Sequence, residues 1–350
     1  MLIQLRTLAA AVALFCLGTA QASGLEFRFN DDAARLYSAA VQKGEIDPAG
    51  AEAIRRLPET AAMVRKMRLK DADAFVEYLR GLGRDARQVD LAAKVQAEFG
   101  RDNGGTFTLA ASEVTRQLKA YLPSDFSARL TVHFIFGGNA TGFAFDDVHD
   151  DVYVNLARFT QATAEELAEV VSHELFHAVQ AHVMTAPPRP TAGTPQAATG
   201  KTWMNRLLYD LVQEATAELF THPIANRPAT PFSTRGKERI ERNLARIRNI
   251  AALMETSSLR LLLAPPRDED QYDRIYGMLF YGDFGDLGYD MGWVMANAIE
   301  RKDGKQAIFR LLQGEPKQFV LRYQQIAESD PALFRFNDDF LNAVRSLGQP

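Results

Sequence analysis

Apolar side chains recur at helical spacing in several short stretches between residues 30 and 122. The clearest stretch is Asp71–Leu82, where apolar residues three and four positions apart define one face. Asp31–Val41, Leu91–Phe99 and Ser112–Leu122 follow the same pattern, with glycine and proline residues between them. The pattern predicts a run of short helices whose charged residues lie on solvated faces, and no chemistry is assigned to them.

Polar and apolar residues begin to alternate at residue 129. Arg129–Phe136 is rich in β-branched and aromatic residues, which is typical of a strand. Gly142–Phe145 and Asp151–Leu156 are two further short stretches of this kind. Together they predict a small sheet of about three strands.

A long helix is predicted after the sheet. Thr163 and Glu166 form the capping-box pattern at its start, and the helix extends to about Met184. A proline-rich stretch then precedes a second strong helix. This helix and the later helical patterns lie at Trp203–Thr221, Lys237–Glu255, Asp286–Glu300, Lys305–Leu312 and Pro331–Leu347. The expected fold class is α+β and mostly helical, with a helical N-terminal region over residues 23–128.

Composition narrows the class of protein. Hydrophobic residues make up 47% of the 350 residues and charged residues 24%, as in an ordinary globular protein. The net charge of -4 gives no basic surface, so a nucleic-acid partner is not expected. The single cysteine excludes an intrachain disulfide and a thiolate metal cage, so any metal site must use histidine and carboxylate ligands.

The first 22 residues have the pattern of a secretory signal peptide. Arg6 precedes an apolar stretch over Leu8–Ala20, and Ala20-Gln21-Ala22 is an A-x-A cleavage pattern. The apolar stretch is shorter than a comfortable membrane span of about 20 residues, which disfavours an uncleaved anchor. Cleavage after Ala22 would remove Cys16 and leave no membrane span. We therefore expect a periplasmic or secreted protein.

One motif in the long helix carries chemistry. His173, Glu174 and His177 form an H-E-x-x-H pattern. Residues four apart lie on one face of a helix, so the two imidazoles can converge on one metal ion. Glu174 lies about 100° round the helix, where it can reach a water molecule without binding the metal. This spacing predicts a zinc site with Glu174 as general base.

A catalytic zinc site needs a third protein ligand. The next long helix contains Glu214 and Glu218, four residues apart on one face, and Asp210 one turn earlier. H-E-x-x-H followed by such a helix resembles the gluzincin zinc peptidases. The resemblance covers residues 129–300, and it is nearest to uncharacterised bacterial zinc-dependent peptidases that share a distant E-x-x-A and a later G-Y-x-x-G.

The resemblance implies a zincin-like metallopeptidase domain over 129–350, with Glu214 as the third ligand and Glu218 hydrogen-bonded to a ligand histidine. Glu218 and Asp210 stay open as alternative ligands. The chain departs from the usual pattern in two ways. The gap from His177 to Glu214 is 37 residues, and Ala215 replaces the usual glycine.

Gly288-Tyr289-Asp290-Met291-Gly292 is the later G-Y-x-x-G element. Many gluzincins use a tyrosine or histidine beyond the third ligand to stabilise the oxyanion, which makes Tyr289 the candidate and Tyr281 the alternate. The alternative interpretation is that the two glycines permit close helix packing and Tyr289 is half-buried core. The other histidines are interpreted as surface or structural, and they are His133, His149, His182 and His222.

These patterns predict an exported zinc metallopeptidase that acts on a peptide or protein substrate. Its substrate could pair with an edge strand within Gly138–Phe145 or Val152–Leu156. The alternative is a non-catalytic exported module that binds a metal or a partner and keeps a peptidase-like fold. A further possibility is that residues 23–128 form a pro-segment or a lid. The pattern does not indicate an oligomeric state.

Overall fold

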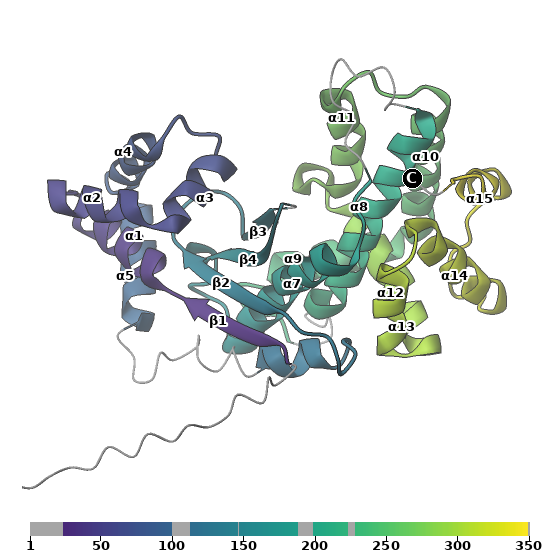
Figure 1. The fold of residues 1–350 in the computed structure, drawn as a ribbon, viewed down its shortest axis with the longest axis horizontal. Helices are drawn as coiled ribbons and strands as arrows, with labels where there is room; N and C mark the ends of the chain where they lie inside the picture. Colours follow the sequence, from purple (N-terminus) through teal and green to yellow (C-terminus); the bar gives the residue numbers. More distant parts are fainter. Residues whose placement is uncertain (1–23, 100–112, 146, 188–198, 223–227, 349–350) are drawn as a thin grey trace, which may run out of the picture.

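A four-stranded mixed sheet lies between two groups of helices (Figure 1). The structure is a computed structural model, and it describes residues 24–99, 113–145, 147–187, 199–222 and 228–348. The predicted signal peptide over 1–22 lies outside the described residues, as does most of the proline-rich stretch. No helix among the described ranges has the length and apolar character that a membrane crossing requires.

The strand order in the sheet is β1-β2-β4-β3. The strands are β1 (Glu26–Asn30), β2 (Arg129–Ile135), β3 (Gly142–Phe145) and β4 (Val148–Asn155). β2 pairs in parallel with β1 and β4, whereas β3 pairs antiparallel with β4 and forms one edge of the sheet. The sequence predicted three strands and did not predict β1. Residues 23–128 are therefore not only helical, because this segment supplies a strand.

The N-terminal helices lie on one side of the sheet in Figure 1. They are α1 (Asp32–Lys43), α2 (Pro48–Arg56), α3 (Pro58–Lys66), α4 (Ala72–Leu82) and α5 (Ala86–Phe99). Asp47 and Asp71 cap α2 and α4 by accepting hydrogen bonds from backbone N–H groups of the first turn. α1 packs against β2, and α5 packs against α1.

The helix α7 (Ala164–Val183) packs against β2, β3 and β4. Its N-terminus has the predicted capping box, in which Thr163 and Glu166 satisfy each other's backbone N–H groups. α7 is buried on most of its circumference, because α8 (Gly200–Thr221) packs beside it. The neighbouring elements therefore hold α7 and α8 firmly in place at the centre of the fold.

The remaining helices form a group around α8 and α12 (Leu287–Asp303) (Figure 1). They are α9 (Thr234–Ala245), α10 (Ile247–Leu263), α11 (Glu269–Phe280), α12, α13 (Lys305–Leu312), α14 (Pro316–Ser329) and α15 (Asp338–Arg345). The single helix predicted over Lys237–Glu255 is wrong, because the backbone leaves the helical region at Arg246. The helix predicted over Pro331–Leu347 begins only at Asp338, and α11 and α14 were not predicted.

Two glycines of the G-Y-x-x-G element lie at close helix contacts. A Cβ atom on Gly292 would lie 2.7 Å from the Cβ of Ala215 on α8, and one on Gly288 would lie 2.5 Å from a ring carbon of Phe280. Only residues without a side chain allow α12 to approach so closely. The buried apolar residues of both helical groups and the sheet form one continuous core.

Candidate metal centre

The helix α7 presents His173, Glu174 and His177 to a cleft of about 460 Å³. The side of the helix that faces the core, including Val171 and Leu175, is fully buried. This burial fixes the rotation of α7 and so fixes the direction in which the motif points. His173 and Glu174 are themselves 8% and 9% exposed, so the motif lies at the floor of the cleft.

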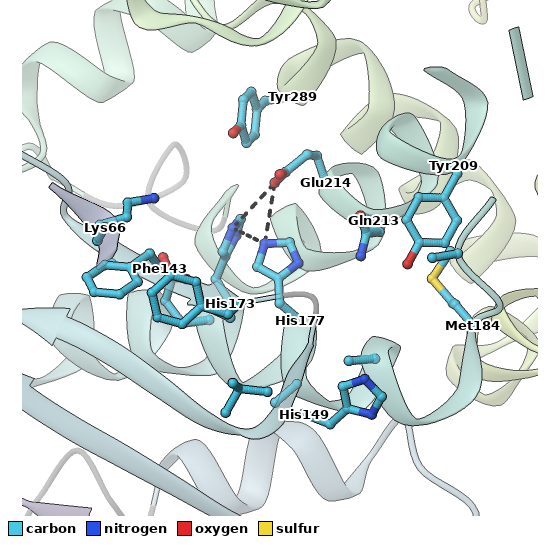
Figure 2. Close-up of a pocket in the computed structure, with 18 of the residues that line it drawn as sticks. Lys66, Phe143, His149, His173, His177, Met184, Tyr209, Gln213, Glu214 and Tyr289 are labelled. Atoms are coloured by element: carbon cyan, nitrogen blue, oxygen red, sulfur yellow. Dashed lines mark hydrogen bonds and ion pairs between the residues drawn. The ribbon is translucent and has the colours of Figure 1, made fainter. Parts of the chain in front are cut away.

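Glu214 on α8 faces the two histidines (Figure 2). Its Oε2 atom lies 3.7 Å from His173 Nε2 and 3.4 Å from His177 Nε2, and the two nitrogens lie 3.1 Å apart. Ligands at about 2.0–2.1 Å from a tetrahedral zinc ion are separated by about 3.3–3.4 Å. These three atoms therefore have the spacing of one face of a zinc coordination tetrahedron.

The Glu214 oxygen supports this fit independently of spacing. Oε2 is buried and has no hydrogen-bond partner among the described residues. It forms ion pairs with the two ligand histidines, and a cation held between the three side chains would satisfy this oxygen. His173, His177 and Glu214 also form a group of metal-binding side chains whose ligand atoms lie within 4.8 Å of one another. The residues present thus fit a zinc ion.

Gln180 orients His177. Its Oε1 lies 2.7 Å from His177 Nδ1, while its Nε2 donates to the backbone oxygen of Gln213 and to Thr216 Oγ1. Gln180 is fully buried, and it links the histidine on α7 to the helix that carries Glu214. A hydrogen bond to Nδ1 leaves Nε2 as the metal-binding atom, which is the usual arrangement around ligand histidines.

Glu218 reaches His173 only through another residue. Thr221 donates a hydrogen bond to Glu218 Oε2 at 2.7 Å, and the Thr221 hydroxyl lies 3.4 Å from His173 Nδ1. The sequence had predicted a direct contact between Glu218 and a ligand histidine. Asp210 lies elsewhere, since its carboxylate pairs with Arg206 and accepts a hydrogen bond from Tyr272. Glu214 is therefore the carboxylate that α8 places against both histidines.

Glu174 lies directly against the edge strand. A Cβ atom built on Gly142 would lie 2.5 Å from Glu174 Cδ and 2.7 Å from Cγ, and closer still to Oε1. Burial raises the pKa of Glu174 to about 7, with the nearby Glu214 carboxylate adding to the effect. A carboxylate with a pKa near neutrality can both accept and release a proton at neutral pH.

The pKa values of the two histidines shift in opposite directions. Burial and the neighbouring His177 lower the pKa of His173 to about 3, so its imidazole is neutral. Burial also disfavours the charged form of His177, but the Glu214 carboxylate outweighs it and raises the pKa to about 9. The same contact holds the pKa of Glu214 below its usual value despite burial. A bound cation would replace the proton of His177 as the positive partner of Glu214.

Tyr289 lies above Glu214 in the cleft wall (Figure 2). A hydrogen bond from Tyr289 is one of the contacts that favour the ionised form of Glu214. The alternate candidate, Tyr281, is 48% exposed and does not line this cleft. Tyr289 is thus the tyrosine that α12 places at the ligand group.

The other histidines have separate positions. His133 is paired with Glu59 and Asp151, His182 with Asp150, and His222 stacks on Trp293. His149 lines the cleft away from the three ligands (Figure 2). None of these four belongs to the ligand group formed by the described residues.

Sequence reasoning missed three residues around the site. Gln180 lies one turn after His177, so helical spacing could have indicated it. Gly142 and Lys66 could not have been found in this way, because they reach the motif from a strand and from α3, both distant in sequence. Lys66 lies between the helices predicted over Asp31–Val41 and Asp71–Leu82, and its side chain is exposed at the cleft wall.

Residues 87–332, more than half of the 350-residue chain, match a known protein family. Its description is "Putative zinc dependent peptidase (DUF5700)". The chain belongs to the DUF5700 family. Zinc is accordingly its metal cofactor, and the ligand group lies inside the matched range. No curated protein and no solved structure matches the chain.

Proposed function

We propose that this DUF5700 protein is an exported zinc metallopeptidase with a gluzincin-type ligand set. His173, His177 and Glu214 would hold the zinc ion, and Glu174 would act as general base. The observation that carries the proposal is the convergence of three ligand atoms within 4.8 Å at the floor of a cleft, with Glu174 beside them. Such a cleft leaves room for a substrate, which favours a peptidase over the non-catalytic alternative.

Zinc, when bound, supplies Lewis-acid polarisation of a carbonyl group and a more acidic water molecule. The chain supplies the proton transfers. Glu174 takes a proton from the attacking water and delivers it to the nitrogen of the leaving amine. Its pKa of about 7 suits both directions of transfer near neutral pH. Tyr289 is proposed as the hydrogen-bond donor to the oxyanion of the tetrahedral intermediate.

Peptides and proteins are the proposed substrates, and the periplasm or the extracellular space is the proposed location. β3 supports a peptide substrate, because it is an edge strand whose residues line the cleft. An extended peptide can pair with such an edge through main-chain hydrogen bonds.

Two measurements test the proposal together. The purified protein should contain about one zinc ion per chain by mass spectrometry, and His173→Ala should lose it. Glu174→Gln should keep the zinc and lose hydrolysis of a quenched peptide library by about 10²–10⁴-fold. Hydrolysis that survives in Glu174→Gln would show that this residue is not the base, and zinc that survives in His173→Ala would show that the ligand set is wrong.

Tyr289 needs a test that separates its two contacts. Tyr289→Phe should keep zinc and lower kcat by about 10²–10³-fold if its hydroxyl donates to the oxyanion. Weaker zinc binding in Tyr289→Phe, with kcat restored at saturating zinc, would instead assign the hydroxyl to the positioning of Glu214.

A further inference from the structure

The cleft carries one cationic side chain that the proposed mechanism does not use. Among the described residues that line it, Lys66 is the only lysine or arginine. Lys66 is the last residue of α3, so it comes from outside the family-matched range of 87–332. Figure 2 shows its ammonium group directed from the cleft wall toward the region of the ligand histidines.

The fold holds Lys66 in place at both ends of α3. At the start of the helix, the buried Glu59 pairs with His133 at 2.6 Å and accepts a hydrogen bond from Asn30. At its end, Arg65 pairs with Asp147 on the sheet side at 2.6 Å. The Lys66 ammonium itself lies 4.9 Å from the centre of the Phe143 ring on β3. Lys66 is thus an exposed side chain at the cleft wall, on a helix that is fixed at both ends, with its ammonium near the Phe143 ring.

No described carboxylate forms an ion pair with Lys66. Glu174 acts on it electrostatically, but at more than ion-pair distance. With zinc bound, the described residues of the cleft would also have no negative charge left to balance the positive charge of Lys66. Among the described residues that line the cleft, the carboxylates are Glu174 and Glu214, and a divalent zinc ion would balance the charge of both in their ionised forms. The loaded cleft would then carry one net positive charge, and that charge would lie at Lys66.

We propose that Lys66 binds a carboxylate group of the peptide substrate. The inference rests on the proposed peptidase function and adds a specificity to it. The two sources of such a group are the C-terminal carboxylate and an Asp or Glu side chain near the cleaved bond. Tyr209, Gln213 and Met184 line the cleft on the side away from Lys66, and no described lysine or arginine lies there (Figure 2).

The experiment measures binding, so that it does not depend on turnover. Four N-acetylated alanine-based hexapeptides are titrated into the zinc-loaded Glu174→Gln protein in a calorimeter. Each peptide has either a free or an amidated C-terminus, and either Glu or Gln at its centre. We expect a free carboxylate in one of the two places to tighten binding by about 10- to 100-fold. The position at which a carboxylate tightens binding shows whether Lys66 binds the C-terminus or an acidic side chain.

Lys66→Met, made in the same background, should remove this preference and leave binding of the neutral peptide unchanged. Lys66→Arg should keep the preference, because it keeps the charge. Lys70→Met is the matched control, since Lys70 is a nearby exposed lysine that does not line the cleft. A direct bond between the peptide carboxylate and zinc would give a preference that survives in Lys66→Met, and that result would overturn the inference. Equal binding of all four peptides would overturn it as well.

Hydrolysis of the same peptides by the zinc-loaded wild-type protein tests the proposed function separately. Cleavage without a Lys66-dependent preference leaves the peptidase standing and removes the inference. A Lys66-dependent binding preference without cleavage of any peptide would support the role of Lys66 and contradict the proposed peptidase function. If Lys66→Met lowers kcat equally for all four peptides and leaves their binding unchanged, Lys66 acts on the reaction itself, and the inference is wrong.

Discussion

Gly142→Ala tests whether the edge strand sets the position of the proposed base. The added Cβ would lie 2.5 Å from Glu174 Cδ and 2.7 Å from Cγ, whereas ordinary contact begins at 3.4 Å. Glu174 must therefore move by roughly 0.7–0.9 Å, because the backbone of Gly142 is held in the sheet by β4. A displacement of about 1 Å at a catalytic group costs about a hundredfold in rate.

We expect kcat for peptide hydrolysis to fall by about a hundredfold in Gly142→Ala, with zinc content unchanged. The zinc ligands are not displaced, because the added Cβ meets Glu174 and not His173, His177 or Glu214. The assay combines peptide cleavage with metal analysis of the same preparation. Gly81→Ala is the matched control, since a Cβ atom at Gly81 has no neighbour within 4 Å. It should leave kcat unchanged.

A double-mutant cycle shows whether the clash with Glu174 is the cause. Gly142→Ala should lower the melting temperature in the wild type, but not in the Glu174→Ala background, where no side chain opposes the new Cβ. Two results would refute the reasoning. One is a Gly142→Ala protein with wild-type kcat. The other is a loss of melting temperature that is equal in both backgrounds.

Three further predictions concern the surroundings of the centre. Gln180→Ala should weaken zinc affinity by about 10- to 100-fold, measured by competition with a chelator, and the protein should stay folded. Unchanged affinity would mean that Gln180 does not orient His177. Gly292→Ala should lower the free energy of unfolding by about 1–3 kcal/mol in urea, because its Cβ would lie 2.7 Å from that of Ala215, whereas Gly236→Ala, with open space around it, should not. For His133 and Glu59, burial opposes both charges, but their contact raises the pKa of His133 above 6.5 and lowers that of Glu59 below 4.5. The pair therefore stabilises the fold most between pH 4.5 and 6.5, and the stabilisation is lost as pH rises through the raised pKa of His133 or falls through the lowered pKa of Glu59. The difference in melting temperature between wild type and His133→Gln should be largest in that window, and a difference that is constant from pH 4 to 9 would contradict this.

The parts of the fold that local pattern determines were predictable. Thr163 and Glu166 are sufficient to locate the start of α7, because a capping box is a contact between near neighbours. β3 and α13 have the predicted bounds, and strand β2 differs by one residue. The H-E-x-x-H spacing likewise requires only one helix, so the pattern could place two histidines on one face.

The remaining parts depend on contacts between distant residues. β1 is a five-residue strand, and its assignment depends on a partner that begins at Arg129. Lys66 reaches the cleft because side chains of α3 contact residues of the sheet, and these contacts join residues that are distant in sequence. No glycine or proline marks the break between α9 and α10 at Arg246. The continuous helical periodicity of the sequence therefore predicted a single helix there.

The pairing of β1 imposes an order on assembly during translation. Glu26 lies beside Arg129, 103 residues further along the chain. At about 5–20 residues per second, the ribosome needs roughly 5–20 s to make the intervening segment. Contacts so far apart in sequence also form late, since closing the loop costs entropy before pairing stabilises it. Phe27 and Phe29 therefore lack their partner strand on the nascent chain throughout this interval.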